Sequence, residues 1–128
     1  MTTILVAADA SWVRDLVRSA FTQPGQRVIE ATSGQQVRAI VDQEEPELVV
    51  LDLQIGNMGG IAVAIDLRLE EAAGRLPGVP IILLLDREAD RFIARRADVD
   101  VALVKPVDAG QLRKVGLELL AAQEAAEG

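Results

Sequence analysis

Leu48-Val49-Val50-Leu51-Asp52 is the stretch that decides the fold, because four consecutive apolar residues stop abruptly at an acid. An apolar run without polar alternation predicts a strand buried on both faces, which is typical of a parallel sheet covered by helices. Two later runs have the same form: 81–85 stops at Asp86, and 101–104 stops at Lys105. The sequence therefore predicts three buried strands of one sheet, each of which ends at a charged residue.

The rest of the chain alternates short apolar runs with helical patterns. Further strands are expected over 4–7 and around 28–29. Amphipathic helical patterns are expected over 11–21, 33–45, 61–72, 90–97 and 108–122. Five strand–helix units in a row predict an α/β protein with a doubly wound parallel sheet between two helical layers. We expect the flavodoxin-like strand order 2-1-3-4-5.

Several polar residues stand where helices should begin. Ser11 is a candidate N-cap of the first helix, Ser33-Gly34-Gln35-Gln36 resembles a capping box, and Asp108 is expected to cap the last helix. The apolar candidates for the buried face of the first helix are Trp12, Leu16 and Phe21.

Length and composition narrow the classes of protein. The chain has 128 residues, no cysteine, no histidine and a formal net charge of −7. We expect one domain over 1–123, followed by a tail or cloning remnant over 124–128. Histidine-based catalysis and zinc binding are excluded, and the acidic balance argues against direct binding to nucleic acid. No run is long enough to span a membrane, and a cytoplasmic location is expected.

Three charged residues lie just after apolar strands: Asp9, Asp52 and Lys105. In a doubly wound sheet the ligand crevice lies outside the carboxyl ends of the strands, so the fold should gather all three there. Two carboxylates form a hard oxygen site suited to Mg²⁺, and a lysine opposite them can pair with a phosphoryl group. Taken singly, each aspartate is more often a turn former. Their coincidence at three strand ends favours a shared site.

The chain resembles the receiver domain of bacterial two-component response regulators along nearly its whole length. The segments that carry the resemblance are Ile4-Leu5-Val6-Ala7-Ala8-Asp9, Leu48-Val49-Val50-Leu51-Asp52-Leu53-Gln54-Ile55-Gly56-Asn57-Met58-Gly59-Gly60 and Val104-Lys105-Pro106-Val107. No single segment is decisive, but the three in this order and spacing are fairly specific.

The resemblance implies a role for each matching residue. Asp52 would accept a phosphoryl group from a sensor histidine kinase or a phosphotransfer protein. Asp9, Asp52 and the backbone carbonyl of Gln54 would bind Mg²⁺, and Lys105 would pair with the phosphoryl oxygens. The Lys105-Pro106 bond would be cis. Any activity of the chain itself would be limited to slow self-catalysed phosphoryl transfer and hydrolysis at Asp52.

The departures from the family pattern are equally specific. The family has two acids after the first strand, and here the first is Ala8, so Mg²⁺ binding should be weak. The hydroxyl residue that ends the fourth strand is replaced by Leu85, which cannot donate a hydrogen bond. The aromatic switch position of the fifth strand is Ala102. Gly56 and Gly59 stand where the loop after the acceptor usually has Pro and Asp.

Two functional hypotheses follow. The first is a receiver that is phosphorylated on Asp52 but has a degenerate switch. The second is a phosphorylation-independent pseudo-receiver that serves as a scaffold for docking or homodimerisation, which Ala8, Leu85 and Ala102 favour. A phosphatase-type hydrolase with an aspartate nucleophile is weaker, because Leu53-Gln54 provides no second acid after Asp52.

Overall fold

A five-stranded parallel sheet organises the protein, in a computed structural model that describes residues 1–56 and 58–127. The strands follow the order β2-β1-β3-β4-β5, which confirms the expected topology. They are β1 (Thr2–Ala7), β2 (Gln26–Ala31), β3 (Leu48–Asp52), β4 (Ile81–Leu85) and β5 (Val101–Val104). Asn57, in the segment that resembles receivers, and Gly128, at the end of the expected tail, lie outside the described residues.

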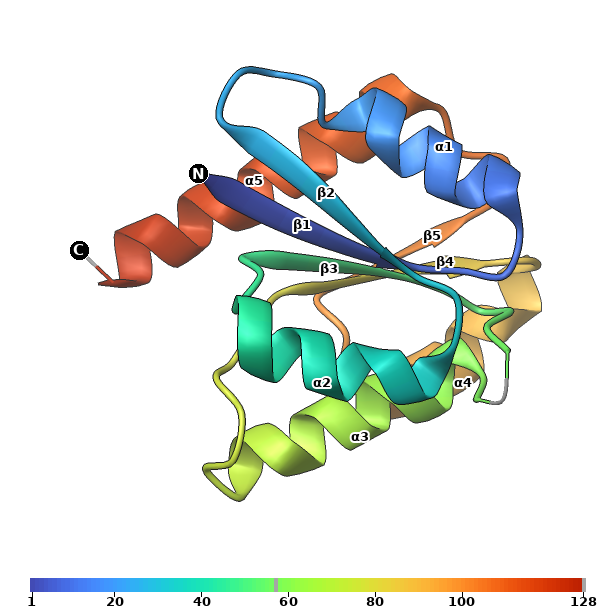
Figure 1. Cartoon of the computed structure of the whole chain (residues 1–128). Helices are drawn as coiled ribbons and strands as arrows, with labels where there is room; N and C mark the ends of the chain where they lie inside the picture. The colour runs from blue at the N-terminus through green and yellow to red at the C-terminus, as the bar shows by residue number, and fades with distance from the viewer. Residues whose placement is uncertain (57, 128) are drawn as a thin grey trace.

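Helices cover both faces of this sheet. The α-helices are α1 (Ser11–Ala20), α2 (Gly34–Glu44), α3 (Gly60–Ala72), α4 (Arg91–Ala94) and α5 (Ala109–Glu127), and α4 is flanked by 3₁₀ turns at Glu88–Asp90 and Arg95–Ala97. In Figure 1, α1 and α5 lie on one side of the sheet, and α2, α3 and α4 lie on the other. The start of β1 and the C-terminal end of α5 lie at the same end of the sheet (Figure 1).

The three central strands are buried because each contributes side chains to two cores. Alternate residues of β3 illustrate this: Val49 and Leu51 pack towards α2 and α3, whereas Leu48 and Val50 pack towards α1 and α5. Every residue of β3 and β4 is buried, as their continuous apolar runs predicted. Strand β5 lies at the edge and is only half-buried.

Local signals at the helix ends were partly misleading. Ser11 is the first residue of α1, and Ala10 occupies the cap position. Ser33 does precede α2 but makes no side-chain cap, and Gln36 Oε1 accepts the Thr32 N–H instead, at 2.9 Å. The capping-box prediction is therefore wrong. Asp108 caps α5 as predicted, since its carboxylate accepts the Gln111 N–H at 2.7 Å.

The prediction of the buried face of α1 was also wrong at one residue. The helix buries Val13, Val17 and Ala20, whereas the Trp12 side chain is 55% exposed. Residues 13, 17 and 20 follow the spacing of one helical face, which turns residue 12 outwards. At the other end of the chain, α5 continues to Glu127 rather than ending near Ala122. No helix among the described residues is long and apolar enough to cross a membrane.

Candidate functional site

The carboxyl ends of β3, β4 and β5 bring together Asp52, Asp86 and Lys105. Asp52 is the last residue of β3 and is only 1% exposed. Lys105 follows β5, and its ammonium group donates one short hydrogen bond to Asp52 Oδ1 and another, of 2.9 Å, to Asp86 Oδ1. The Lys105-Pro106 bond is cis, as the resemblance implied. One lysine is therefore shared by two carboxylates at the end of the sheet.

Burial and pairing shift the ionisation of these groups in different directions. Burial raises the pKa of Asp52 above its ordinary value, although the hydrogen bond from Lys105 acts in the opposite direction. The hydrogen bond from Lys105 lowers the pKa of Asp86, which is more exposed. Burial alone would lower the pKa of Lys105, but its bonds to the two aspartates raise it. The lysine stays charged, so the cluster retains a fixed cation beside a poorly hydrated carboxylate.

Asp9 lies against the loop that follows Asp52. Its carboxylate Oδ1 accepts the Gly56 N–H at 2.5 Å, and its own N–H donates to the Gln54 carbonyl at 3.3 Å. A β-carbon on Gly56 would lie only 3.0 Å from Asp9 Oδ1, so glycine allows the loop to approach this closely. Of the predicted site residues, Asp9 and Gln54 therefore contact each other, as do Asp52 and Lys105.

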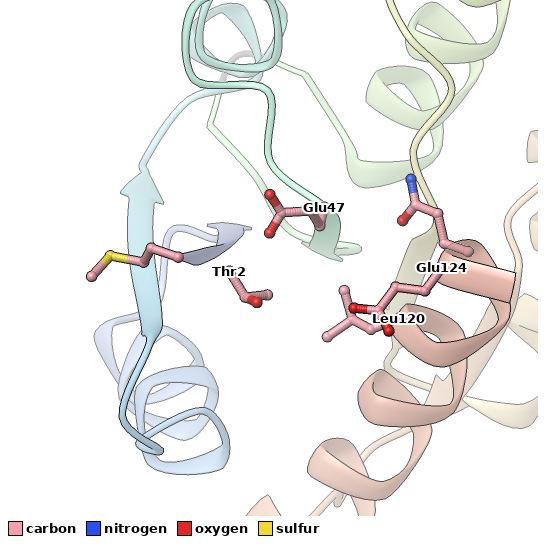
Figure 2. Close-up of a pocket in the computed structure, with 6 residues that line it drawn as sticks. Thr2, Glu47, Leu120 and Glu124 are labelled. Carbon is pink, nitrogen blue, oxygen red and sulfur yellow. The ribbon is translucent and has the colours of Figure 1, made fainter. Parts of the chain in front are cut away.

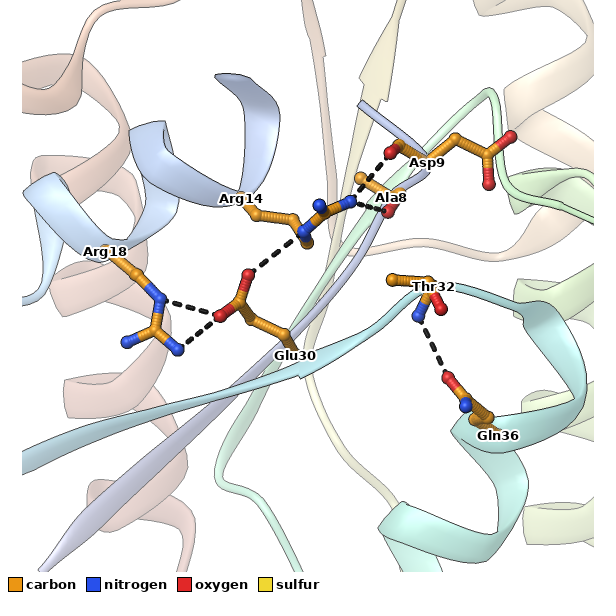
Figure 3. A network of polar contacts seen from close by, with 7 residues as sticks. All are labelled: Ala8, Asp9, Arg14, Arg18, Glu30, Thr32 and Gln36. Carbon is orange, nitrogen blue, oxygen red and sulfur yellow. Dashed lines mark hydrogen bonds and ion pairs between the residues drawn. The ribbon is translucent and has the colours of Figure 1, made fainter. Parts of the chain in front are cut away.

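Figure 3 shows an arginine network that fixes the segment carrying Asp9. Arg14, on α1, donates to the backbone carbonyls of Ala8 and Asp9 at 2.9 and 2.7 Å. Glu30, on β2, pairs with Arg14 at 3.0 Å and also accepts a hydrogen bond from Arg18. Because the guanidinium group satisfies both carbonyls, it fixes the turn between β1 and α1 and the starting point of the Asp9 side chain.

The oxygen donors at this edge suit a hard divalent cation, but they are few. Asp9, Asp52 and the Gln54 carbonyl supply oxygen ligands of the kind that Mg²⁺ prefers. Each already accepts a hydrogen bond from Gly56, Lys105 or Asp9. No group of three acidic side chains arranged to hold a metal occurs within residues 1–56 and 58–127. These oxygens are of the type that a magnesium ion accepts, and an ion held by so few of them would complete its coordination with water.

Apolar residues occupy the positions that depart from the family pattern. Ala8 and Leu85 are completely buried, and Leu85 belongs to the core beneath α2 and α3. Ala102 is half-buried and leaves a surface hollow that Arg91 and Val99 help to line. Arg91 extends across this region and donates to the Ala102 carbonyl at 3.1 Å. Arg91 therefore contacts the backbone of the residue at which the resemblance implies an aromatic side chain.

A pocket at the opposite end of the sheet does not serve the same chemistry. It is lined by Thr2, Glu47, Leu120 and Glu124, among others, and lies at the start of β1 (Figure 2). Glu47 already has a structural role, since its carboxylate accepts the Thr3 N–H at 2.7 Å. The cluster of Asp52, Asp86 and Lys105 lies at the other end of the strands.

Sequence reasoning missed three side chains of the site. For Asp86 the sequence favoured a turn over a replacement polar group beside Leu85, whereas in the structure it contacts Lys105 and accepts a hydrogen bond from the Gln54 side chain at 3.2 Å. Gln54 was predicted to contribute only its carbonyl. Arg14 was overlooked, although its place five residues after Asp9 puts it on the next helix. The sequence did contain a signal for Asp86. It directly follows the apolar run of β4, just as Asp52 stands at the end of the apolar run of β3.

Comparison with known proteins identifies the family. The family model described as response regulator receiver domain matches residues 4–115. The KDP operon transcriptional regulatory protein KdpE of Escherichia coli (strain K12) is 34% identical over 115 residues, covering 88% of this chain and 48% of that protein. The probable transcriptional regulator ycf27 of Porphyridium aerugineum is 33% identical over 111 residues, covering 85% and 44%. The chain thus spans about half the length of these curated relatives.

Solved structures share the fold. The CheY-like receiver domain protein of Methanospirillum hungatei JF-1 has a TM-score of 0.80 at 23% identity, covering 100% of this chain and 99% of that one. The receiver domain of a Pseudomonas aeruginosa sensor histidine kinase has a TM-score of 0.76 at 21% identity, covering 94% and 98%, and has a magnesium ion coordinated in its active-site cleft. The family match over residues 4–115 shows that the chain belongs to the receiver domains of two-component response regulators.

Proposed function

We propose that Asp52 accepts a phosphoryl group from a sensor histidine kinase or a phosphotransfer protein. The observation that carries this proposal is the pair between the buried Asp52 carboxylate and Lys105 at the carboxyl edge of the sheet. A largely buried ion pair is costly in solvation free energy, because both charges lose water. A phosphoryl acceptor needs this combination, since the lysine can neutralise the charge that arrives.

The chemistry follows from the charges of these groups. A carboxylate oxygen of Asp52 attacks the phosphorus of a phosphohistidine, and the electron pair of the breaking P–N bond passes to the ring nitrogen. The imidazole leaves as a neutral ring because its other nitrogen carries a proton. Lys105 then pairs with the phosphoryl oxygens as well as with the carboxylate. Phosphorylation adds nearly two negative charges, so a cation must already be in position. Donors such as acetyl phosphate would react slowly by the same substitution, and water would slowly remove the group.

Magnesium binding completes this proposal. Bound Mg²⁺ would supply positive charge against the oxygens of the transferring group. Asp9, Asp52 and the Gln54 carbonyl would hold it, and Gly56 orients the Asp9 carboxylate at 2.5 Å. Binding should be weak because Ala8 stands where the family has an acid. The cytoplasmic location and the domain boundary at residue 123 also stay predictions from the sequence.

The proposed switch is degenerate. Leu85 offers no hydroxyl to the phosphoryl group, and Ala102 has no ring that could change position. A ligand shifts a conformational equilibrium only by the difference between its interactions with the two states. With those two interactions absent, a phosphoryl group on Asp52 should change the α4 and β5 surface less than it does in a receiver with both side chains.

Phosphorylation can be tested directly with acetyl phosphate, Mg²⁺ and intact-mass measurement. We expect the wild type to gain one phosphoryl group and Asp52→Asn to gain none. Asp66→Asn is the matched control, because Asp66 lies on α3 and pairs with Arg38 on the surface. A wild type that gains no mass, or an Asp52→Asn variant that gains as much as the wild type, would contradict the proposal.

A second candidate is a pseudo-receiver that docks to a partner or forms a homodimer without phosphorylation. The buried Ala8 and Leu85 favour it, because two polar positions of the family site are apolar here. It leaves the shared lysine without a purpose, which is why it ranks second. Absence of a mass gain in the wild type, with normal folding, would make it the better account.

A further inference from the structure

The geometry points to Asp86 as a positioning residue that shares the Lys105 ammonium group with Asp52 and weakens the hold of the site on an anionic phosphoryl group. This inference rests on the proposed function, since it concerns the same lysine. It assigns a purpose to an acid that standard sequence patterns interpret as a turn residue.

The contacts of Asp86 place it in the site rather than in the turn. Its Oδ1 accepts from Lys105 at 2.9 Å, and its Oδ2 accepts from the Gln54 side chain at 3.2 Å. Both carboxylate oxygens therefore face groups of the candidate site. The bond to Gln54 also links the end of β4 to the loop after β3, directly beside Asp52.

The turn after β4 is stabilised by a different acid. Asp90 Oδ2 accepts the Arg87 N–H at 2.9 Å, and Asp90 is only 4% exposed. Within the described part of the chain, the hydrogen bonds of the Asp86 carboxylate come from side chains alone. Because Asp90 already fills the role of the turn former, that role does not explain Asp86.

The negative charge of Asp86 should weaken the binding of an anion beside Lys105. One ammonium group serves two carboxylates, and a phosphoryl group on Asp52 would bring further negative charge to the same cation. Asp86 then repels the incoming anion and competes for Lys105. Removing the charge of Asp86 should leave Lys105 to Asp52 and its phosphoryl group, so that anionic ligands bind more tightly.

The test compares three variants. Asp86→Asn removes the charge and keeps the shape, and Asp86→Glu restores the charge. Glu88→Gln is the matched control, since it removes one negative charge two residues away, from a side chain that pairs with Arg91 at 2.5 Å. All three are studied as the full chain, with thermal unfolding to confirm that each folds.

The first measurement needs no phosphoryl donor. The chain has two lysines, Lys105 and Lys114, so the NMR signals of their ammonium groups can be assigned by difference. We expect the Lys105 signal to shift and its protons to exchange faster in Asp86→Asn, with Asp86→Glu resembling the wild type. Lys114 is exposed and serves as the internal reference. A Lys105 signal that is the same in Asp86→Asn and wild type would refute the contact.

The second measurement is a beryllofluoride titration with Mg²⁺, followed by Trp12 fluorescence. We expect the apparent Kd to fall by a factor of about 3–10 in Asp86→Asn, to change less than about twofold in Glu88→Gln, and to return towards the wild-type value in Asp86→Glu. An unchanged or weaker affinity in Asp86→Asn, beside measurable binding by the wild type, would refute the inference alone. If neither protein binds beryllofluoride or gains mass from acetyl phosphate, both the inference and the proposed function fail.

Discussion

Two parts of the same sheet edge differ in chemistry: the acceptor pair, Asp52 with Lys105, and the switch positions, Leu85 and Ala102. The acceptor pair consists of two charged groups, and one of them, Asp52, is only 1% exposed. Leu85 is completely buried among apolar side chains, and its carbonyl accepts the N–H of Lys105 at 2.9 Å. Neighbouring backbone positions thus carry opposite chemistries. The part that would receive a phosphoryl group carries charge, whereas the switch positions are apolar, with Leu85 in the core and Ala102 half-buried.

The two parts differ in what they contribute to the free energy of folding. Leu85 adds buried apolar area, which stabilises the fold at no electrostatic cost. The acceptor pair costs solvation free energy that a core leucine would not. A chain kept only as a scaffold has no physical need for the acceptor pair, which is why the contrast favours phosphorylation with weak coupling.

The largest expected effect concerns the cation of the acceptor pair. Lys105→Met should lower the free energy of unfolding by about 2–4 kcal/mol at neutral pH, because it leaves Asp52 buried without a partner. The loss should shrink at acidic pH, where Asp52 binds a proton. Urea unfolding measures this, with Lys114→Met as the control at an exposed position. Equal effects of the two substitutions would mean that the acceptor pair contributes nothing to stability.

The next effect concerns the acid missing beside Asp9. Ala8→Asp should tighten Mg²⁺ binding by about tenfold, because a third carboxylate would face the cation. Asp9→Ala should abolish binding. Trp12 fluorescence can follow both titrations, since the indole ring lies 5.6 Å from the Lys105 ammonium nitrogen. If Asp9→Ala binds Mg²⁺ like the wild type, the ligand set is wrong.

A smaller effect concerns the cost of an ionised Asp52. Burial raises its pKa in the folded state, so the folded protein binds this proton more tightly than the unfolded chain does. The contribution of Asp52 to stability is therefore most favourable below the unfolded value of about 4 and is lost as pH rises through the raised value. Asp52→Asn should raise the free energy of unfolding by about 1 kcal/mol at pH 7.

The same comparison at low pH supplies the control. Near pH 3.5 both states of the wild type are largely protonated at Asp52, so the advantage of Asp52→Asn should mostly disappear. Denaturant unfolding at the two pH values measures the difference. A clear loss of stability in Asp52→Asn at pH 7 would instead indicate that the carboxylate is a structural hydrogen-bond acceptor.

The fold could be predicted because many residues together indicate it. The uninterrupted apolar run of β4 and the charged residues after β3 and β5 each restrict the topology, and an error at one residue changes little. Individual side chains were less predictable. Trp12 was assigned to the buried face because it is apolar, but the buried face of α1 is set by Val13 and Val17. Helix periodicity outweighs the hydrophobicity of one residue.

For the candidate site, the sequence could predict which residues stand at the strand ends but not which side chains contact one another. The carboxyl ends of parallel strands meet at one edge, so Asp52 and Lys105 could be placed there from the sequence. The contacts of Asp86 and Arg14 depend on side-chain directions across neighbouring elements, which sequence spacing does not determine. The capping box at Ser33 failed for a related reason, because the Gln36 side chain had a competing backbone N–H at Thr32.

The most direct test of the contrast between the acceptor pair and the switch positions is an NMR comparison with and without beryllofluoride and Mg²⁺. We predict amide shifts near Asp9 and over 52–56, with small shifts over 86–107. Leu85→Thr combined with Ala8→Asp should enlarge the shifts over 86–107, since a hydroxyl could then bond the bound anion. Large shifts over 86–107 in the wild type would contradict the degenerate switch, and no shifts anywhere would contradict the acceptor assignment itself.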